Sequence, residues 1–170
     1  MKKIILLGSF ALFGATNAQE GFNVGAHVGL PMGDAKDAYS FKLGLDASYM
    51  FPVADNFKAG IASGYQAWLG KSYSLTDGST TISGKYDTIS MVPIAATGMF
   101  KVNDQFGIGA DLGYGFMFAS GESEGGFYYQ PKVSYSFGDS GALWLGYQGL
   151  SKNGFTFSAI NLGYSFNIAK

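Results

Sequence analysis

The sequence contains no cysteine and a single histidine among its 170 residues. Without cysteine it has no disulfide framework, and it is not a lipid-anchored lipoprotein, which would need a cysteine directly after an N-terminal apolar segment. A metal site built from several histidines is also excluded. Catalysis by a Ser-His-acid arrangement would have to use His27, which has no neighbouring serine on its own stretch of chain.

Charge and long apolar runs are scarce as well. Charged residues make up 14% of the chain, and no run reaches the roughly 18 apolar residues of a membrane-spanning helix. The longest apolar segment, residues 4–13, follows Lys2 and Lys3 and is too short to span a bilayer. Small residues at Thr16 and Ala18 then flank a cleavage point before Gln19. These features predict a secretory signal peptide at 1–18 and a mature domain at 19–170.

The charge balance argues against one class of partner. Removing residues 1–18 takes two of the eleven basic residues and no acidic one, which leaves nine against twelve and a net charge of −3. So small a charge of that sign gives no electrostatic basis for binding nucleic acid.

Glycine and aromatic residues are plentiful, and they alternate. In residues 106–118 every second residue is apolar, and the residues between them are mostly glycine. A period of two indicates a β-strand with two different environments. Thirteen residues at about 3.3 Å each, tilted by about 45°, cover about 30 Å, the thickness of a hydrocarbon core. We therefore interpret this stretch as a transmembrane strand whose apolar face contacts lipid.

The same pattern occurs eight times between Phe22 and Phe166. The predicted strands lie at about 22–30, 39–51, 57–69, 86–101, 106–118, 127–137, 143–148 and 160–166. The fourth is the least regular, because both of its faces are apolar. Pro93 cannot donate a ladder hydrogen bond, so a β-bulge that switches the phase is expected there. The fold class is thus all-β, an eight-stranded antiparallel up-and-down transmembrane barrel.

The connections between these strands alternate in length. Three are short turns, whereas those at 31–38, 70–84, 119–126 and 149–154 are more polar and mostly longer. Asp77-Gly78 is a type I′ hairpin signal, which predicts that the third and fourth strands extend beyond the membrane as a protruding hairpin. Outer-membrane barrels have short periplasmic turns and longer external loops, so we expect these four connections to be external.

The two faces of the predicted strands also differ in charge. No charged residue falls on the apolar face of any strand, where a Lys at mid-bilayer would cost about 2–4 kcal/mol. A soluble lipocalin-type barrel would show the opposite arrangement. Five polar side chains lie inside near mid-height and form a predicted lumen network: His27, Lys42, Asp46, Asp111 and Lys132. Mutual neutralisation is the simpler role for it, and a proton or ion relay is the alternative.

On this strand pattern, loop asymmetry and aromatic last strand, the chain resembles the small outer-membrane β-barrels of Gram-negative envelopes, the OmpX-like and OmpA-like proteins. The resemblance covers Phe22 to Phe166 and implies an outer-membrane location, no cofactor and recognition of the last strand by the barrel assembly machinery. Such proteins usually end on an aromatic residue, whereas four residues follow Phe166 here. We therefore place the assembly signal at Tyr164 and Phe166.

The expected function follows from barrel size. Eight strands enclose an interior just wide enough for side chains to fill it, so we expect a filled lumen and a structural or surface-interaction role, for a monomer. Partners would be outer-membrane lipid or lipopolysaccharide, or an extracellular ligand at the four external connections. A narrow porin-like pore for small solutes or ions is the alternative. A lipid-modifying barrel enzyme, faintly suggested by Pro93 and Pro131, is a remote one, because no histidine lies at the outer leaflet.

Overall fold

The computed structural model describes residues 21–77, 80–119, 122–138, 141–152 and 154–168. The predicted signal peptide lies outside these residues. No helix within them is long and apolar enough to cross a membrane.

Eight of the strands close into one antiparallel barrel. Around the barrel the order is β1-β10-β9-β8-β7-β6-β3-β2, so strands adjacent in the barrel are also consecutive along the chain once the separate β4-β5 sheet is set aside. The barrel strands are β1 (Phe22–Met32), β2 (Tyr39–Ala54), β3 (Phe57–Gly70), β6 (Ile89–Lys101), β7 (Phe106–Ala119), β8 (Glu122–Ser136), β9 (Gly141–Lys152) and β10 (Phe155–Asn167). The predicted eight-stranded up-and-down barrel is confirmed, and β1 closes it against β10.

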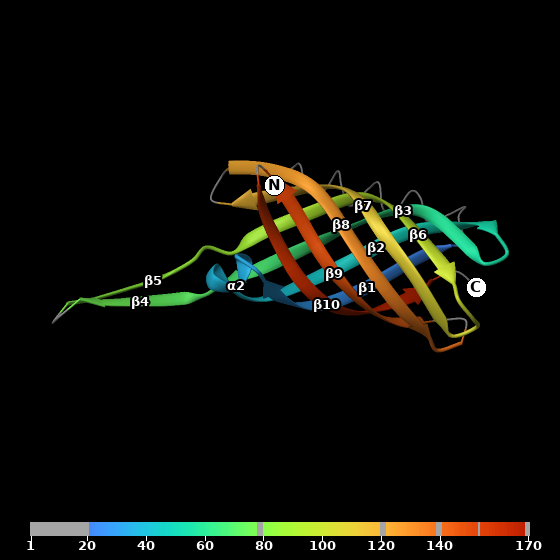
Figure 1. Ribbon diagram of the computed structural model, residues 1–170, viewed down its shortest axis with the longest axis horizontal. Coiled ribbons are helices and arrows are strands. Elements are labelled where there is room, and N and C mark those ends of the chain that lie inside the picture. The colour runs from blue at the N-terminus through green and yellow to red at the C-terminus, as the bar shows by residue number, and fades with distance from the viewer. Residues whose placement is uncertain (1–20, 78–79, 120–121, 139–140, 153, 169–170) are drawn as a thin grey trace.

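The barrel has two different ends (Figure 1). At the turn end, short connections join β2 to β3, β6 to β7 and β8 to β9, and β10 finishes beside the start of β1. At the hairpin end lie the one-turn helix α2 (Ala35–Ala38) and the separate two-stranded sheet of β4 (Ser72–Asp77) and β5 (Thr80–Lys85). Figure 1 shows β4 and β5 extending well away from the barrel. This confirms the predicted protruding hairpin, although its turn at 78–79 lies outside the described residues.

The outer wall of the barrel is apolar. Outward side chains alternate with inward ones along each strand, and many of the outward ones are large and exposed, up to 68% for Ile61 and 64% for Leu45. Soluble proteins rarely expose a continuous apolar belt of this kind, whereas lipid requires one. The belt includes Val28, Leu30, Leu43, Tyr65, Ile94, Ile108, Leu112, Tyr114, Val133, Leu145, Ile160 and Leu162.

The expected switch of phase within β6 does not occur. Its register with β7 runs without a shift from Ser90↔Phe118 to Lys101↔Gly107. The register with β3 is also the same on both sides of Pro93, from Ser63↔Ile94 to Gln66↔Met91, and the residues between make no ladder pairs. The predicted bulge at Pro93 is therefore wrong. The missing N–H interrupts the ladder on one side without moving the chain.

A bulge occurs instead at the start of β2. The register with β3 shifts between Tyr39 and Phe41, so Tyr39, which the alternation places on the lipid face, points inward and is 7% exposed. Its ring then packs inside the hairpin end.

Three of the predicted external connections are shorter than expected. Strand β7 pairs with β8 up to Ala119↔Glu122, so most of the predicted loop 119–126 is strand. Strand β9 pairs with β10 up to Phe155↔Lys152, which removes most of the predicted loop 149–154. Between β1 and β2 the predicted turn region 31–38 begins as strand and ends as α2. Among the described residues, the hairpin end thus presents α2 and the β4-β5 hairpin.

Candidate functional site in the barrel lumen

The lumen is built differently at its two ends, because the size of the inward side chains changes along the strands. In the half nearer the turns the inward residues are mostly small: Gly25, Ser48, Gly60, Ala62, Gly64, Gly107, Gly109, Ser134, Ser136, Ala142, Gly163 and Ser165. In the half nearer the hairpin they are mostly large, as with Lys42, Gln66, Trp68, Met91, Tyr128, Gln148 and Leu150. Side-chain volume therefore fills one half and leaves the other hollow.

An apolar cluster occupies the hairpin end. Its buried members are Ala35, Tyr39, Trp68, Met91, Ala95, Tyr128, Leu150 and Ala159, with Ala38, Ile89, Met117 and Phe157 packed against them. The rings of Tyr39, Trp68 and Phe157 contact one another, with centroids 6.0–6.4 Å apart. Trp68 and Tyr128 both point inward and are 2% and 3% exposed.

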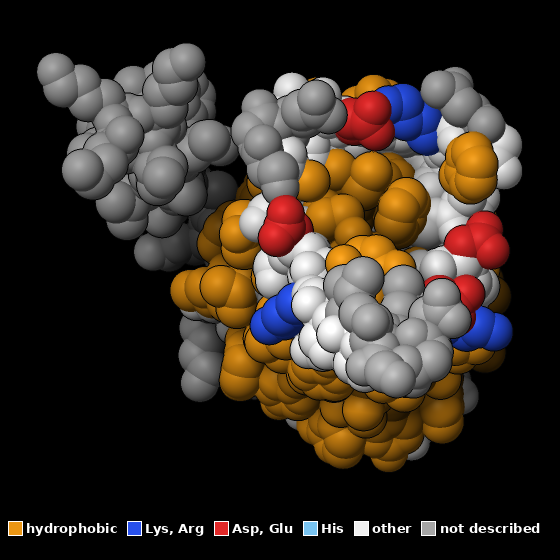
Figure 2. All heavy atoms as spheres, turned by 90° about the vertical axis from the view of Figure 1, so that its left-hand side faces the viewer, with side chains coloured by type: hydrophobic (Ala, Val, Ile, Leu, Met, Phe, Trp, Pro, Cys, Tyr) orange, Lys and Arg blue, Asp and Glu red, His pale blue; other side chains and the backbone are white. Residues whose placement is uncertain are grey.

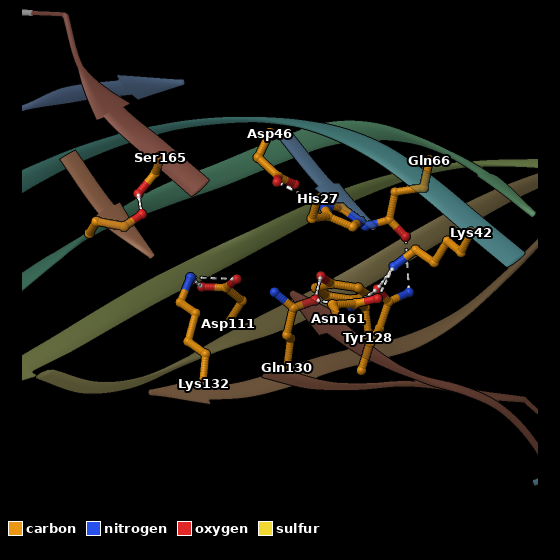
Figure 3. Close-up of polar contacts among 12 residues, drawn as sticks. His27, Lys42, Asp46, Gln66, Asp111, Tyr128, Gln130, Lys132, Asn161 and Ser165 are labelled. Carbon is orange, nitrogen blue, oxygen red and sulfur yellow. Dashed lines mark hydrogen bonds and ion pairs between the residues drawn. The ribbon is translucent and has the colours of Figure 1, made fainter. Parts of the chain in front are cut away.

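Below this cluster a polar network crosses the lumen (Figure 3). The Lys42 ammonium donates to Gln148 Oε1 and, at 3.1 Å, to Asn161 Oδ1. Gln148 in turn donates to Gln66 at 3.0 Å, and Asn161 donates to Gln130 at 3.1 Å. Strands β2, β3, β8, β9 and β10 are thereby joined through side chains.

Lys42 has no carboxylate partner in the described part of the chain and is fully buried. Amide oxygens solvate its charge, and its ammonium lies 5.4 Å from the centroid of the Trp68 ring. Desolvating an ammonium group is costly, so these contacts are needed to keep it there.

The other four residues of the predicted network form two separate pairs, one a hydrogen-bonded pair and the other an ion pair. Asp46 Oδ2 lies 2.7 Å from His27 Nδ1. Lys132 Nζ lies 2.8 and 2.9 Å from the two oxygens of Asp111. Strand β2, which carries Asp46, and strand β8, which carries Lys132, lie on opposite sides of the barrel. All five predicted residues thus face the interior, and the structure divides them into two pairs and one amide-bound lysine.

The amides of this network were not among the predicted site residues. Gln66, Gln130, Gln148 and Asn161 are each at most 3% exposed. The alternation of the sequence places all four inside, and this is the signal by which they could have been found. Their partnership with Lys42 depends on the relative heights of strands far apart in sequence, which alternation does not specify.

At the turn end the lumen opens into a cavity, called here the vestibule. Its inner part has a volume of about 240 Å³ and reaches Asp46, Asp111, Tyr128 and Gln130. Its outer part, about 510 Å³, reaches the turns and shares Asn23, Lys58, Ser134 and Ser165 among other wall residues with the inner part. Neither part is lined by Lys42, Trp68 or Leu150. The vestibule therefore ends at about half the length of the strands.

The opposite mouth carries charges of both signs around an apolar floor (Figure 2). Helix α2 is tied to the base of the hairpin, because Lys71 donates both from its backbone N–H to Ala38 O at 2.8 Å and from Nζ to Lys36 O at 2.5 Å. Asp34, Asp37 and Asp87 are exposed at this end together with Lys36 and Lys71. Within the described residues no group of three or more His, Asp or Glu side chains is arranged to hold a metal ion.

The last strand carries the proposed assembly signal. Tyr164 and Phe166 pair with Ala26 and Val24 of β1, and their rings contact each other edge to face at 4.6 Å. The backbone N–H of Ile168 donates to Phe22 O at 3.1 Å. Pairing with β1 therefore extends beyond Phe166.

No protein-family model matches this sequence, and no curated protein matches it. Solved structures do match by shape. The N-terminal β-barrel domain of Pseudomonas aeruginosa OprF aligns with 87% of this chain and 97% of its own, at 11% identity and a TM-score of 0.54. Ail, the attachment invasion locus protein of Yersinia pestis, aligns with 86% of this chain and 95% of its own, at 13% identity and a TM-score of 0.52. At these identities the similarity establishes the fold, which is that of the small outer-membrane β-barrels.

Proposed function

We propose that the protein is an integral outer-membrane barrel with a non-conducting lumen, and that it acts at the cell surface through its hairpin end as a structural or adhesive component. The observation that carries this proposal is the network around Lys42. It crosses the lumen between β2 and β9 with fully buried side chains, directly beneath the apolar cluster.

The side-chain packing supports a closed lumen. A conducting pore needs a continuous hydrated path, and the full burial of Lys42, Gln66, Gln148 and Asn161 argues against such a path at their level. Opening such a path would separate several hydrogen bonds at once. Each buried group left unpaired would cost about 1–3 kcal/mol.

The hairpin supports a role at the surface. Strands β4 and β5 pair only with each other within the described residues, so both outer edges of the hairpin present free backbone groups. Such an edge can accept a further strand from a partner protein. Ail, which shares this fold, is named for attachment and invasion, and an adhesive role here is a proposal by analogy with that name.

One property of Ail is not carried over. A structure of Ail contains a heparin analogue, sucrose octasulfate, and a ligand of this kind requires a concentration of positive charge. The hairpin end of this chain mixes Lys36 and Lys71 with Asp34, Asp37 and Asp87. We therefore propose protein or lipopolysaccharide surfaces, and not sulfated polysaccharide, as its partners.

The remaining expectations belong to the same proposal. The barrel is proposed to be a monomer, to be inserted by the barrel assembly machinery, and to need no cofactor. A non-enzymatic role is supported by His27, whose Nδ1 is bonded to Asp46 while its Nε2 has no partner within the described residues. No serine hydroxyl is therefore positioned there for activation.

A narrow pore stays as the second candidate, and the vestibule favours it. Half of the path across the barrel is already open and polar. Displacement of the Lys42 network and of the apolar cluster above it would connect this half to the other mouth.

Planar-bilayer recordings with refolded protein test the closed lumen. We expect no steady conductance from the native barrel, and a channel from the double variant Lys42→Ala and Trp68→Ala. Steady conductance of the native barrel would favour the pore. The surface role is tested by expressing the native protein and a variant with a short turn in place of residues 72–85, and by measuring adhesion to cultured epithelial monolayers. Equal adhesion at equal surface amounts would refute a role of the hairpin.

A further inference from the structure

The vestibule is a cavity for which the proposed surface function has no use. It opens at the end opposite the hairpin and ends blindly beneath the Lys42 network. With inner and outer parts of about 240 and 510 Å³ it is as large as small-molecule sites, which span about 300–1,000 Å³.

Hydroxyl groups line its walls. Ser48 and Ser136 face the inner part and make no side-chain hydrogen bond with any described residue. Ser134 contacts only Met99 Sδ, at 3.6 Å, and Ser165 makes a long bond of 3.4 Å to Ala142 O. The hydroxyls of Ser48 and Ser136 are available both to donate and to accept, and those of Ser134 and Ser165, which already donate, are available to accept.

The inner end of the vestibule carries an unused donor. Gln130 is 3% exposed and lines the cavity. Its Oε1 accepts from Tyr128 OH and from Asn161 Nδ2, both at 3.1 Å, whereas its Nε2 has no hydrogen bond to a described residue. In Figure 3 this nitrogen points away from Asn161. This nitrogen is accessible from the cavity, since it is not among the buried atoms that lack a partner, and so it can donate to a polar guest.

Charge decides which polar guest fits. Asp46 and Asp111 line the inner part together with Lys58 and Lys132, so the formal charges cancel. Lys132 and Asp111 also neutralise each other directly. A net anion or cation would gain little here, whereas a neutral molecule with many hydroxyl groups would match carboxylate acceptors, an amide donor and serine hydroxyls.

One wall adds an apolar surface. The Trp144 ring lines the inner part and lies against Gly163, where a Cβ would come within 2.6 Å of Trp144 Nε1. It also contacts His27, with centroids 5.4 Å apart. An indole beside hydroxyl, carboxylate and amide groups suits the mixed C–H and O–H surface of a sugar ring.

We propose that the vestibule is a blind binding site for a small uncharged saccharide. The sugar occupies the inner part, accepts from Gln130 Nε2, donates to Asp46 and lies near Trp144. The proposal does not depend on the hairpin or on adhesion. The saccharide site and the proposed surface role can therefore each fail without the other.

The protein itself supplies the reporter. It has two tryptophans, Trp68 and Trp144, so Trp68→Phe leaves the vestibule residue as the only one. The refolded mature barrel is titrated with N-acetylglucosamine, glucose and chitotriose in a detergent without a sugar headgroup, with glucuronate as the charged comparison. We expect a saturable change in Trp144 emission for the neutral sugars and an at least tenfold weaker response to glucuronate. Tighter binding of the trisaccharide than of the monosaccharides would identify a polymeric glycan as the source of the ligand. Equal binding of both would identify a free sugar.

Two variants locate the site. Ser134→Phe fills the vestibule and should abolish the response, whereas Ser123→Phe, at the exposed hairpin end of β8, should leave it unchanged. Asp46→Asn adds no bulk and should weaken binding about tenfold, the effect of one lost charged hydrogen bond. Folding of each variant is checked by its heat-dependent gel mobility. Saturation-transfer NMR on the unaltered protein repeats the titration without the Trp68 change. No saturable response to a neutral sugar in either measurement, or an undiminished one in Ser134→Phe, would overturn the proposal.

Discussion

Ser63 donates a hydrogen bond from Oγ to the carbonyl oxygen of Pro93, at 2.8 Å, across the short stretch in which β3 and β6 make no ladder pairs. Pro93 lacks the N–H that would have paired there. Ser63 faces outward on a strand whose other outward residues are apolar, such as Ile61 and Tyr65. A polar side chain at this position of the belt supplies a donor to the Pro93 carbonyl oxygen where the ladder is interrupted.

The bond should therefore be measurable. Ser63→Ala should lower the free energy of unfolding by about 0.5–1.5 kcal/mol in the native background. In a Pro93→Ala background, where the ladder can form, the same change should cost less. Urea unfolding followed by tryptophan fluorescence gives both values, and equal costs in the two backgrounds would contradict the compensation.

The second prediction concerns the buried lysine. Lys42→Met keeps the length of the side chain and removes the donor from Gln148 and Asn161. The free energy of unfolding should fall by about 1–3 kcal/mol, because buried acceptors lose their partner. Lys58→Met, at the exposed turn end, is the matched control and should change little. A Lys42→Met barrel as stable as the native one would show that the amide side chains stay packed without the ammonium group. Replacement of a buried charge by an apolar residue is without cost to stability in other proteins as well.

The third prediction separates a buried ion pair from an exposed one. Asp111 and Lys132 have side chains 7% and 16% exposed, whereas Lys101 and Asp104, 2.9 Å apart, have side chains 56% and 99% exposed. A double-mutant cycle with Asp111→Asn and Lys132→Met should give a coupling of about 1–3 kcal/mol that changes little with salt. The same cycle on the exposed pair should give a value near zero. Similar couplings for the two pairs would mean that water reaches both equally.

The orientation of the barrel in the membrane is the fourth prediction. The chain has no cysteine of its own, so single cysteines report cleanly. Ser74→Cys, on the hairpin, should react with a membrane-impermeant maleimide on intact cells, whereas Asp104→Cys, at the turn end, should react only after lysis. Labelling in the reverse order would place the vestibule on the outside.

The fifth prediction concerns assembly. Replacing both Tyr164 and Phe166 by Ser should sharply reduce the heat-modifiable barrel in outer membranes, because the last strand would lose its aromatic end. Leu143→Ser with Leu145→Ser, on the neighbouring outward face of β9, is the control for lost lipid contact alone. Deletion of residues 167–170 removes one pair with Asn23 and the bond from Ile168 to Phe22 and should be tolerated. Failure of that truncation with normal assembly of the Tyr164 and Phe166 variant would move the signal to the chain end.

The sequence predicts which face a residue occupies better than which residue it meets. Strict alternation places His27, Lys42 and Asp111 inside, and the structure agrees, because side chains on a strand have a period of two. Alternation fails at Tyr39, where a bulge reverses the phase, but it continues through Pro93, where the expected bulge does not occur. Both depend on the partner strand, which local sequence does not contain.

Strand ends and lumen contacts are the less predictable part. Glycine and serine at 119–126 suggest a loop, yet pairing with the neighbouring strand carries β7 and β8 through most of it. The contact between Lys42 and Gln148 spans 106 residues of sequence and depends on the tilt of every strand between them. The change from small to large inward residues was visible in the sequence, and it is what locates the vestibule.

That change has an electrical consequence. A polar cavity of this size holds water, whose high dielectric constant carries the potential of the compartment at the turn end inward toward Gln130. Any voltage across the membrane then falls over the filled half of the barrel alone, and the field there is steeper than in a uniformly packed barrel. Lys42 is the buried charge that lies within this drop, and the voltage across the membrane therefore acts on the hydrogen bonds that hold it.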